Sequence, residues 1–469
     1  MSSNVCQIFP FRGLRYDEAQ AGSLNQVTAP PYDVINPQEQ EAFYAQSPYN
    51  VVRLILNQSE PGDTLEKGVY TRAAGFFKDW QSEGVLQMDE APGFYAYTQT
   101  WQEASGKTIE RKGVIGLLKL EPFETGVVLP HERTLGGPKA DRLNLMKTAL
   151  GNFSQIFMIY DDPACQLEAL LEQQRKDLAW SQATDGDGVL HQLGLIQDEA
   201  SCDSLKQMFS NQVLLIADGH HRYETALNFK AEVRQTLYRD KNLPEPPEGG
   251  LLSDYVMVFL TNMNDPGLKV YPTHRVLYKW PEGWTQERFE TEFFKQVNAL
   301  ETCSDQSWGY WSSTHPEFTQ VDATQAQPVL TLPEVLQGLD VAQLDAVVFD
   351  GIFNTSANDL KAQGVLGFYR NEAELRQKMA SGEVVAVFWM DTPNVAQIRQ
   401  VSMAGLRMPQ KSTYFYPKTL SGLVLYPYHP NVKHPEVNSL SGVLVEPVPV
   451  VTPLPLVSTY QPALSQMNR

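Results

Sequence analysis

The stretch Val213-Leu-Leu-Ile-Ala-Asp-Gly-His-His-Arg-Tyr-Glu-Thr-Ala-Leu227 predicts a strand, a tight turn and the start of a helix. The apolar residues 213–217 form a run that is too short for a buried helix and is typical of a buried strand. Asp218-Gly219 ends this run, and apolar residues recur at helical spacing from about His221 onward. We therefore expect the fold to be organised around this turn and the chemistry of the chain to lie there.

A turn of this kind is ready to bind an anion. The first amides of a helix have no intrahelical partners, and their dipoles favour negative charge. Arg222 adds a planar guanidinium that suits phosphate, and Gly219 permits a positive φ or a close backbone approach. Asp218, His220 and His221 add groups that hold Mg²⁺ or move protons. In the alternative interpretation, Asp218 is a helix cap and the histidines are ordinary partners in a polar turn.

Composition restricts the classes of function. With 42% hydrophobic and 20% charged residues, the 469-residue chain has the composition of a globular protein with two or three domains. Its net charge of −18 argues against binding to nucleic acid, which depends on neutralising phosphates. The four cysteines are far apart and predict neither disulfides nor a zinc site. No apolar run suits a membrane helix and no signal peptide is recognisable, so we expect a cytoplasmic protein.

The N-terminal phrase Val27-Thr-Ala-Pro-Pro-Tyr-Asp-Val-Ile35 predicts a stiff loop, because two prolines keep the backbone extended. This loop presents Tyr32 and Asp33. Asp33 is a candidate metal ligand or base in the site. Equally, it could cap a helix that begins near Pro37.

A second polar cluster lies in Leu129-Pro-His-Glu-Arg-Thr-Leu-Gly-Gly-Pro-Lys-Ala-Asp-Arg-Leu143. A His-Glu pair beside a glycine-rich turn and several cations is what a phosphorylated substrate requires. We expect a helix to start at about Asp141. The candidate residues in this cluster are His131, Glu132, Lys139 and Arg142; the alternative is an ordinary charged loop.

A third cluster is Arg407-Met-Pro-Gln-Lys-Ser-Thr-Tyr-Phe-Tyr-Pro-Lys418, whose cations and hydroxyls suit an anion. Its candidate phosphate contacts are Lys411, Ser412 and Lys418. His274 and Arg275, in the phrase Pro-Thr-His-Arg, are weaker candidates for the same role. An exposed basic loop is the structural alternative for the third cluster.

Between these clusters the patterns predict a mixed α/β protein. We expect a strand over 50–56, a hairpin of 94–101 with 108–118, helices over 199–209 and 372–381, and a strand over 255–262. The Pro/Gly-rich segment 241–250 suggests a boundary. The expected division is therefore 1–240 for the part with the Asp-Gly-His-His-Arg turn, 251–425 for a second α/β unit, and 426–469 for a proline-rich tail.

Several of these phrases resemble the DUF1015 family, whose biochemical role is largely unassigned. They are Pro-Pro-Tyr-Asp-Val-Ile, the His-Glu pair with Lys-x-Asp-Arg, the turn at 216–227, Pro-Thr-His-Arg and the 407–418 motif. The turn also resembles that of the ParB/sulfiredoxin superfamily, which includes CTP-hydrolysing ParB proteins, sulfiredoxins and ADP-dependent free-serine kinases. The Asp-Gly-His-x-Arg turn of the kinases matches Asp218, Gly219, His220 and Arg222. Sulfiredoxins have a catalytic cysteine at the position of His220. Because this chain has no cysteine there, the resemblance does not extend to sulfiredoxin chemistry. It implies a ParB/sulfiredoxin-like core with an additional C-terminal α/β unit.

Two lines of argument, the anion-ready turn and the kinase resemblance, favour a phosphotransferase that uses a nucleotide (ADP, ATP or CTP) and Mg²⁺ on a small hydroxylated metabolite. Asp218 and Asp33 would hold the metal or orient the acceptor, Arg222 would bind phosphate, and His220 or Glu132 would be the base. A ParB-like nucleotide switch and a phosphate-ester hydrolase remain alternatives. The sequence leaves the oligomeric state open.

Overall fold

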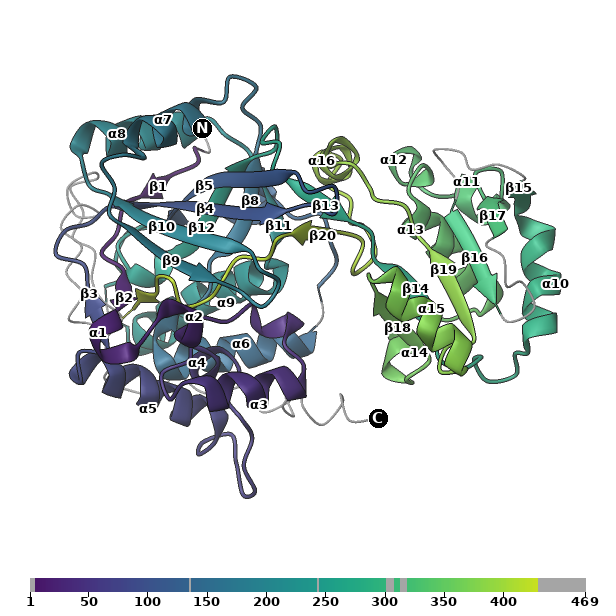
Figure 1. Ribbon diagram of the computed structural model, residues 1–469, viewed down its shortest axis with the longest axis horizontal. Coiled ribbons are helices and arrows are strands. Elements are labelled where there is room, and N and C mark those ends of the chain that lie inside the picture. The colour runs from purple at the N-terminus through teal and green to yellow at the C-terminus, as the bar shows by residue number, and fades with distance from the viewer. Residues whose placement is uncertain (1–4, 135, 243, 301–307, 313–318, 429–469) are drawn as a thin grey trace. The chain divides into compact units, whose positions relative to one another are not determined.

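A computed structural model describes residues 5–134, 136–242, 244–300, 308–312 and 319–428 (Figure 1). The described residues form two compact units. Unit 1 comprises the described residues within Met1–Leu129, Thr134–Leu268 and Pro417–Asn468. Unit 2 comprises the described residues within Pro130–Arg133 and Lys269–Tyr416. In the described part of the chain, no helix combines the length and the hydropathy needed to cross a membrane.

Unit 1 is built on a nine-stranded mixed sheet with the strand order β6-β11-β8-β12-β5-β4-β10-β9, in which β1 also pairs with β5. Two of the pairings are parallel, β11 with β6 and β12 with β8, and the others are antiparallel. Every residue of β8 and β12 is buried, because helices cover both faces of the sheet. The strands are β1 (Ile8–Phe9), β4 (Phe94–Gln102), β5 (Thr108–Lys119), β6 (Val128–Leu129), β8 (Ile156–Tyr160), β9 (Trp180–Thr184), β10 (Leu190–Ile196), β11 (Leu214–Asp218) and β12 (Tyr255–Asn262).

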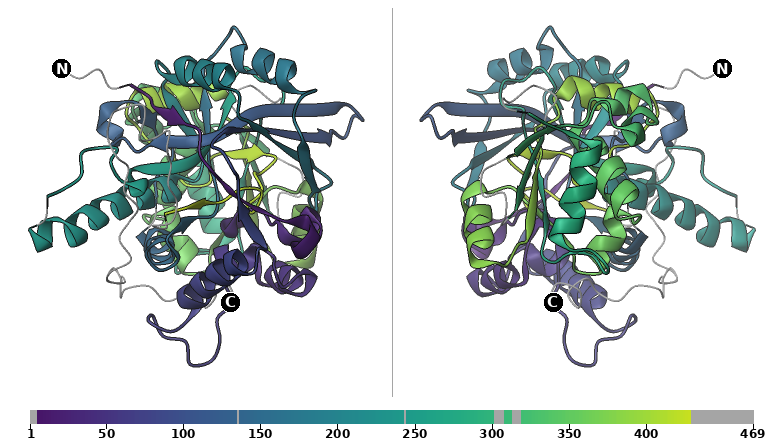
Figure 2. Two further views of the ribbon diagram at one scale, coloured as in Figure 1. Left: turned by 90° about the vertical axis from the view of Figure 1, so that its left-hand side faces the viewer. Right: turned by 90° about the vertical axis from the view of Figure 1, so that its right-hand side faces the viewer.

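Helices α7 and α8 lie on one side of this sheet, and α5, α6 and α9 lie on the other (Figures 1 and 2). The helices and turns of unit 1 are α1 (Glu18–Ala21), α2 (Leu24–Val27), η1 (Tyr32–Val34), α3 (Pro37–Gln46), α4 (Val52–Ile55), α5 (Val69–Ser82), η2 (Phe123–Thr125), α6 (Gly136–Ala149), α7 (Gln166–Gln174), α8 (Glu199–Phe209), α9 (His220–Leu237), η3 (Arg239–Lys241) and η4 (Leu252–Asp254). Two small ribbons complete the unit, β2 (Leu14–Tyr16) with β3 (Leu86–Met88) and β7 (Gly151–Asn152) with β21 (Tyr426–Pro427).

Unit 2 contains a six-stranded antiparallel sheet with the order β15-β17-β16-β19-β14-β18. Its strands are β14 (His274–Leu277), β15 (Asn298–Leu300), β16 (Trp308–Ser312), β17 (Thr319–Asp322), β18 (Leu366–Tyr369) and β19 (Ala386–Trp389), and a separate ribbon pairs β13 (Lys269–Tyr271) with β20 (Tyr414–Tyr416). Its helices are α10 (Gln286–Gln296), α11 (Gln327–Leu330), α12 (Glu334–Gln337), α13 (Asp340–Leu344), the π-helix η5 (Asp345–Ile352), α14 (Ala357–Ala362), α15 (Glu372–Ser381) and α16 (Val395–Met403). Phe289 is completely buried among aromatic rings in the core.

The mixed α/β class expected from the sequence is confirmed. Elements with long, regular patterns also have the expected bounds, as in α8, α15 and β12, and the hairpin is formed by β4 and β5. In each of these segments the apolar spacing agrees with the burial that the tertiary structure imposes.

Two local predictions are wrong, and one of the two alternatives for Asp33 is excluded. The segment 50–56 contains helix α4 instead of a strand, and the Asn50 side chain accepts from the amide of Val52 at 2.9 Å to start its single turn. Helix α6 begins at Gly136 and not at Asp141, because its first turn tolerates a proline without an amide hydrogen. Helix α3 is capped by Asn36, whose side chain accepts from the amide of Glu39 at 2.9 Å, so Asp33 is not its cap.

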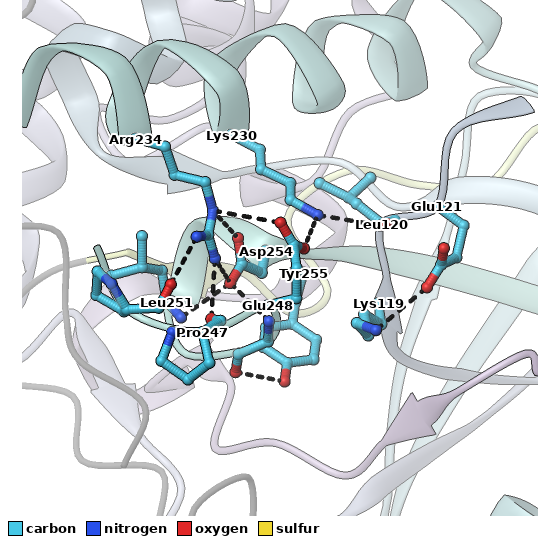
Figure 3. Close-up of polar contacts among 12 residues, drawn as sticks. Lys119, Leu120, Glu121, Lys230, Arg234, Pro247, Glu248, Leu251, Asp254 and Tyr255 are labelled. Atoms are coloured by element: carbon cyan, nitrogen blue, oxygen red, sulfur yellow. Dashed lines mark hydrogen bonds and ion pairs between the residues drawn. The ribbon is translucent and has the colours of Figure 1, made fainter. Parts of the chain in front are cut away.

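The boundary expected at 241–250 does not separate the two units, because β12 follows it and lies inside the sheet of unit 1. Figure 3 shows why the segment stays with unit 1. Arg234 of α9 donates to the Asp254 carboxylate at 2.6 Å and 3.1 Å, to Glu245 at 2.9 Å, and to the carbonyls of Pro246 and Pro247. These contacts tie the proline-rich segment to α9. Of the expected tail, 426–428 pack in unit 1 and 429–469 lie outside the described residues.

Candidate functional site

The candidate site of unit 1 is built on the turn between β11 and α9. β11 ends at Asp218, and Gly219 adopts a left-handed conformation with φ +98°. A residue without Cβ accepts this conformation readily, and it lets α9 begin at the next residue, His220. Gly219 is the N-cap and supplies no capping side chain, so the first amides of α9 remain directed at the turn.

Two cations share the carboxylate of Asp218. Arg222 Nη2 donates to Asp218 Oδ2 at 2.6 Å, and Lys418 Nζ donates to Asp218 Oδ1. The other end of the guanidinium, Nη1, donates to the carbonyl of Gln155 at 2.6 Å. The side chains of Arg222, Asp218 and Lys418 are only 9%, 14% and 13% exposed, respectively. Together these three groups have one net positive charge in a poorly solvated position at the positive end of a helix, which favours an anion.

The segment that contains Lys418 is fixed by buried polar groups from the sheet. Arg111 Nη2 donates to the carbonyl of Pro417, and Gln99 Nε2 donates to the carbonyl of Lys418 at 2.8 Å. Gln155 Nε2 donates to the carbonyl of Leu420 at 3.0 Å. Complete burial lowers the pKa of Arg111 to about 10, so its guanidinium stays charged at neutral pH and adds a further cation close to Asp218.

The helices α6 and α9 are joined at their N-terminal ends. Glu224, in the first turns of α9, accepts from Lys139 Nζ at 2.8 Å and from Thr134 Oγ1 at 2.8 Å and 3.0 Å. Thr225 Oγ1 also donates to the carbonyl of Lys139 at 3.4 Å. Thus Lys139, a residue of the second sequence cluster, lies next to the turn at Gly219.

The Pro-Pro-Tyr-Asp loop joins the same region through Tyr32. The guanidinium carbon of Arg142 lies 3.9 Å from the centre of the Tyr32 ring, and Arg142 Nε donates to Asp141 at 2.8 Å. Burial raises the pKa of Tyr32, against the opposing influence of the Arg142 and Arg222 charges. Asp33 is exposed in η1. The motif thus brings its tyrosine against the cations, while its carboxylate faces solvent.

Unit 2 contains the remaining candidates. His131 is completely buried, and its Nε2 lies 2.9 Å from Thr413 Oγ1. Glu132 Oε1 accepts from the amide of Ser412 at 3.1 Å. Ser412 is 1% exposed and its hydroxyl donates to the carbonyl of Pro409. The His-Glu pair and the 407–416 part of the third cluster therefore organise one another.

His274 and Arg275 are also internal to unit 2. His274 stacks on Trp389 with ring centres 3.7 Å apart, and its Nδ1 accepts from the amide of Met390 at 3.1 Å. Arg275 donates to the carbonyls of Thr273 and Gln410. Burial lowers the pKa of His274 to about 4 and that of Arg275 to about 10. His274 is therefore neutral at pH 7, and its observed contacts are those of a packed core residue.

The structure thus assigns the predicted site residues to two groups. Unit 1 contains Asp33, Lys139, Arg142, Asp218, Gly219, His220, His221, Arg222 and Lys418, and unit 2 contains His131, Glu132, His274, Arg275, Lys411 and Ser412. In the first turn of α9, His220 is buried and His221 is half-buried. Lys411 is exposed, with φ +56°.

Sequence reasoning missed four residues that shape the site of unit 1: Gln99, Arg111, Gln155 and Glu224. Glu224 stands inside the 213–227 stretch, four residues after His220, so the helical period could have indicated it. Gln99 and Arg111 face each other across the β4–β5 hairpin. The available signal was the expected hairpin of 94–101 with 108–118, whose strands contain both of these polar side chains.

A magnesium site made by the protein alone does not fit this geometry. Both oxygens of Asp218 accept from cations, and Asp33 is exposed. Among the described residues, no group of three or more His, Cys, Asp or Glu side chains is arranged to hold a metal ion. Lys418 and Arg222 already neutralise the carboxylate that was expected to bind the metal.

Comparison with solved structures gives distant similarities only. A free serine kinase in complex with AMP matches with 11% identity and a TM-score of 0.35, covering 66% of this chain and 90% of that chain. A conserved hypothetical protein from Pyrococcus furiosus has 11% identity and a TM-score of 0.32, with 62% and 87% covered. SbnI with a C-terminal truncation, from Staphylococcus aureus, has 10% identity and a TM-score of 0.34, with 66% and 86% covered. All three TM-scores are below 0.5, and no assignment of activity rests on them.

Comparison with protein families is decisive. No curated protein matches the chain. A family model described as "Protein of unknown function (DUF1015)" matches residues 8–347, which is more than half of the sequence. This range includes the Pro-Pro-Tyr-Asp loop, the His-Glu and Lys-x-Asp-Arg cluster, and the strand–turn–helix at Gly219. The chain therefore belongs to the DUF1015 family.

Proposed function

We propose that unit 1 is a nucleotide-dependent phosphotransferase that acts on a small hydroxylated metabolite. The observation that carries the proposal is the pair of cations, Arg222 and Lys418, that share the Asp218 carboxylate at the N-terminus of α9. Phosphoryl transfer needs little covalent chemistry from a protein and depends mainly on positioning and on neutralising charge. A helix terminus with a guanidinium and an ammonium supplies both.

In the proposed reaction, the acceptor hydroxyl oxygen attacks the terminal phosphorus of the nucleotide. A new O–P bond forms, the P–O bond to the rest of the nucleotide breaks, and the nucleotide leaves one phosphate shorter. The hydroxyl proton passes to an imidazole of the first turn of α9, His220 or His221. Arg222, Lys418 and the first amides of α9 stabilise the charge on the equatorial oxygens, and Asp218 keeps the two cations in place.

The other expected participants have different places in this proposal. Lys139 lies beside the turn through Glu224, and Arg142 lies against Tyr32, so both suit binding of the distal parts of a phosphorylated ligand. Glu132, the second candidate base, belongs to unit 2 and accepts from the Ser412 amide. No step is assigned to Mg²⁺, because the carboxylate proposed to bind it is already neutralised.

The test is incubation of the intact protein with ADP, ATP or CTP and a mixture of hydroxy amino acids, followed by phosphorus NMR. A new phosphate-ester resonance that depends on the acceptor supports transfer. Inorganic phosphate alone indicates an ester or nucleotide hydrolase, and nucleotide line-broadening without turnover indicates a binding protein; either result rejects the phosphotransferase.

The residues are tested by substitution in the same assay. We expect Arg222→Ala and the double variant His220→Ala/His221→Ala to abolish the transfer. Arg239→Ala is the matched control, since this residue lies in η3, beyond the C-terminal end of α9, and its side chain is 57% exposed and pairs with Glu245. Transfer that survives Arg222→Ala and the double histidine variant would show that the reaction occurs elsewhere.

A further inference from the structure

The backbone on either side of the Lys418 side chain is anchored by three side chains of the neighbouring strands β4 and β5. Gln99 of β4 donates to the carbonyl of Lys418 at 2.8 Å, and Arg111 of β5 donates to the carbonyl of the preceding residue, Pro417. The amide of Leu420 donates to the hydroxyl of Tyr97, also on β4, at 3.2 Å. The position of the Lys418 ammonium against Asp218 therefore depends on side chains inside the sheet.

Tyr97 belongs to a longer chain of hydrogen bonds. Its hydroxyl lies 2.7 Å from Nδ1 of His191 on β10, and His191 Nε2 lies 3.0 Å from Oδ2 of Asp185. Tyr97 and His191 are completely buried, whereas the Asp185 side chain is 17% exposed in the turn between β9 and β10. The chain thus runs from a surface turn to the backbone beside Lys418.

The partners fix the protonation state of His191. A carboxylate of Asp185 only accepts, so His191 Nε2 has the hydrogen. In the neutral ring Nδ1 is then an acceptor, and it receives the hydrogen of the Tyr97 hydroxyl, whose oxygen accepts from the Leu420 amide. Gln99 Nε2 lies 3.4 Å from the same Nδ1 and is also a donor, because Gln99 Oε1 accepts from Arg111. A proton on Nδ1 would therefore oppose the Gln99 donor and would remove the acceptor of the Tyr97 hydroxyl hydrogen.

We infer that Asp185, His191 and Tyr97 are positioning residues that keep Lys418 in place for anion binding, and that they do so only while His191 is neutral. The inference rests on the proposed function, because it concerns the anion site of that function. It adds a regulation of the site by acid, through a residue that does not touch the ligand.

The charges around His191 agree with this direction. The titratable groups that face it are Asp185 from the β9–β10 turn, Tyr97 from β4 and Arg111 from β5. Burial lowers the pKa of His191 from its ordinary value of 6.5, Asp185 opposes this, and the Arg111 charge adds to it. The neutral ring is thus favoured in the folded protein, and its contribution to stability is fully present above pH 6.5. This contribution is lost as the pH falls through the lowered pKa of His191 in the folded protein.

The first test measures the affinity for inorganic pyrophosphate by calorimetry, from about pH 8 down to about pH 4.5. His191→Asn keeps an acceptor toward Tyr97 without titrating, so the ratio of wild-type to His191→Asn affinity cancels the protonation of pyrophosphate. We expect this ratio to fall about tenfold on acidification, as for the loss of about one hydrogen bond. A ratio that stays constant over the whole range would overturn the inference.

The second test needs no ligand. The intact protein is acetylated with acetic anhydride at constant pH, and the labelling of Lys418 is measured by mass spectrometry relative to Lys206, which pairs with Asp203 on α8. We expect Tyr97→Phe and His191→Leu to raise Lys418 labelling several-fold, and His191→Asn to leave it close to wild type. Equal labelling in all variants with wild-type thermal midpoints contradicts the inference. A wild type that binds no pyrophosphate contradicts the proposed function alone.

Discussion

The buried pair of Arg234 and Asp254 gives a prediction whose size follows from its contacts. Asp254 is completely buried and accepts from Arg234 Nη2 at 2.6 Å, Arg234 Nε at 3.1 Å, the Gly249 amide at 2.9 Å and the Leu251 amide at 3.0 Å (Figure 3). Asp254→Asn leaves the Arg234 charge buried and opposes its Nε with an amide donor. Removing one partner of such a pair costs about 3–5 kcal/mol. Because Glu245 still pairs with Arg234 Nη1, we expect a loss of about 3 kcal/mol of unfolding free energy by this same rule.

The assay is urea unfolding followed by fluorescence, with a thermal scan in parallel. For a domain of this size, about 3 kcal/mol corresponds to a fall in Tm of roughly 6 °C. Glu245→Gln is the control. Although the guanidinium groups of Arg239 and Arg234 lower the pKa of Glu245 to about 2, its position near solvent screens the interaction, and we expect a loss of less than about 1 kcal/mol. Equal losses in the two variants would refute the argument from burial.

Three further predictions concern the turn, unit 2 and the metal. Gly219→Ala places a Cβ 3.0 Å from the Arg222 guanidinium at a φ of +98°, so this variant should lose about 1–2 kcal/mol of stability and should also bind pyrophosphate more weakly. The control, Gly126→Ala, has a φ of +74° and open space around the added Cβ, so it should lose stability only. Equal pyrophosphate affinities in the two variants would contradict this prediction. Since burial lowers the pKa of His274 from 6.5 to about 4, its neutral ring contributes about 3 kcal/mol above pH 6.5 that disappears as the pH falls to 4. Urea unfolding of His274→Asn should therefore be less sensitive to pH over this window, and an unchanged sensitivity would refute the assignment. Finally, EDTA should leave the pyrophosphate affinity measured by calorimetry unchanged, whereas its loss would indicate a metal at Asp218.

The fold could be predicted where local pattern and tertiary burial agree. The strand 213–217 and the helix after Gly219 appear as β11 and α9 within one residue at their junction, because an apolar run, a glycine and a helical period leave one arrangement. The pattern of α4 wrongly predicts a strand because its apolar residues, Val52, Leu54 and Ile55, are buried in a single turn. A run this short has no distinguishing period.

The site was only partly predictable, for reasons of distance along the chain. The composition of 407–418 indicates Lys418 as an anion contact, but its contact with Asp218 joins residues 200 positions apart, and no local rule predicts such a pair. The residues of the second and third clusters are divided between the two units. Glu132 and Ser412 belong to unit 2, whereas Lys139 and Lys418 belong to unit 1. Sequence spacing cannot indicate this division, since it depends on where the chain enters and leaves each sheet.

The most direct test of the anion site is the pyrophosphate affinity of Arg222→Met and Lys418→Met, with Arg239→Met and Lys206→Met as controls at exposed ion pairs. Each charge-assisted hydrogen bond contributes about 1.5–3 kcal/mol, so each site variant should bind about 10–100-fold more weakly in calorimetry. Both controls should bind as the wild type does. Wild-type affinity in either site variant, with a folded protein, would contradict the assignment of the site to the start of α9.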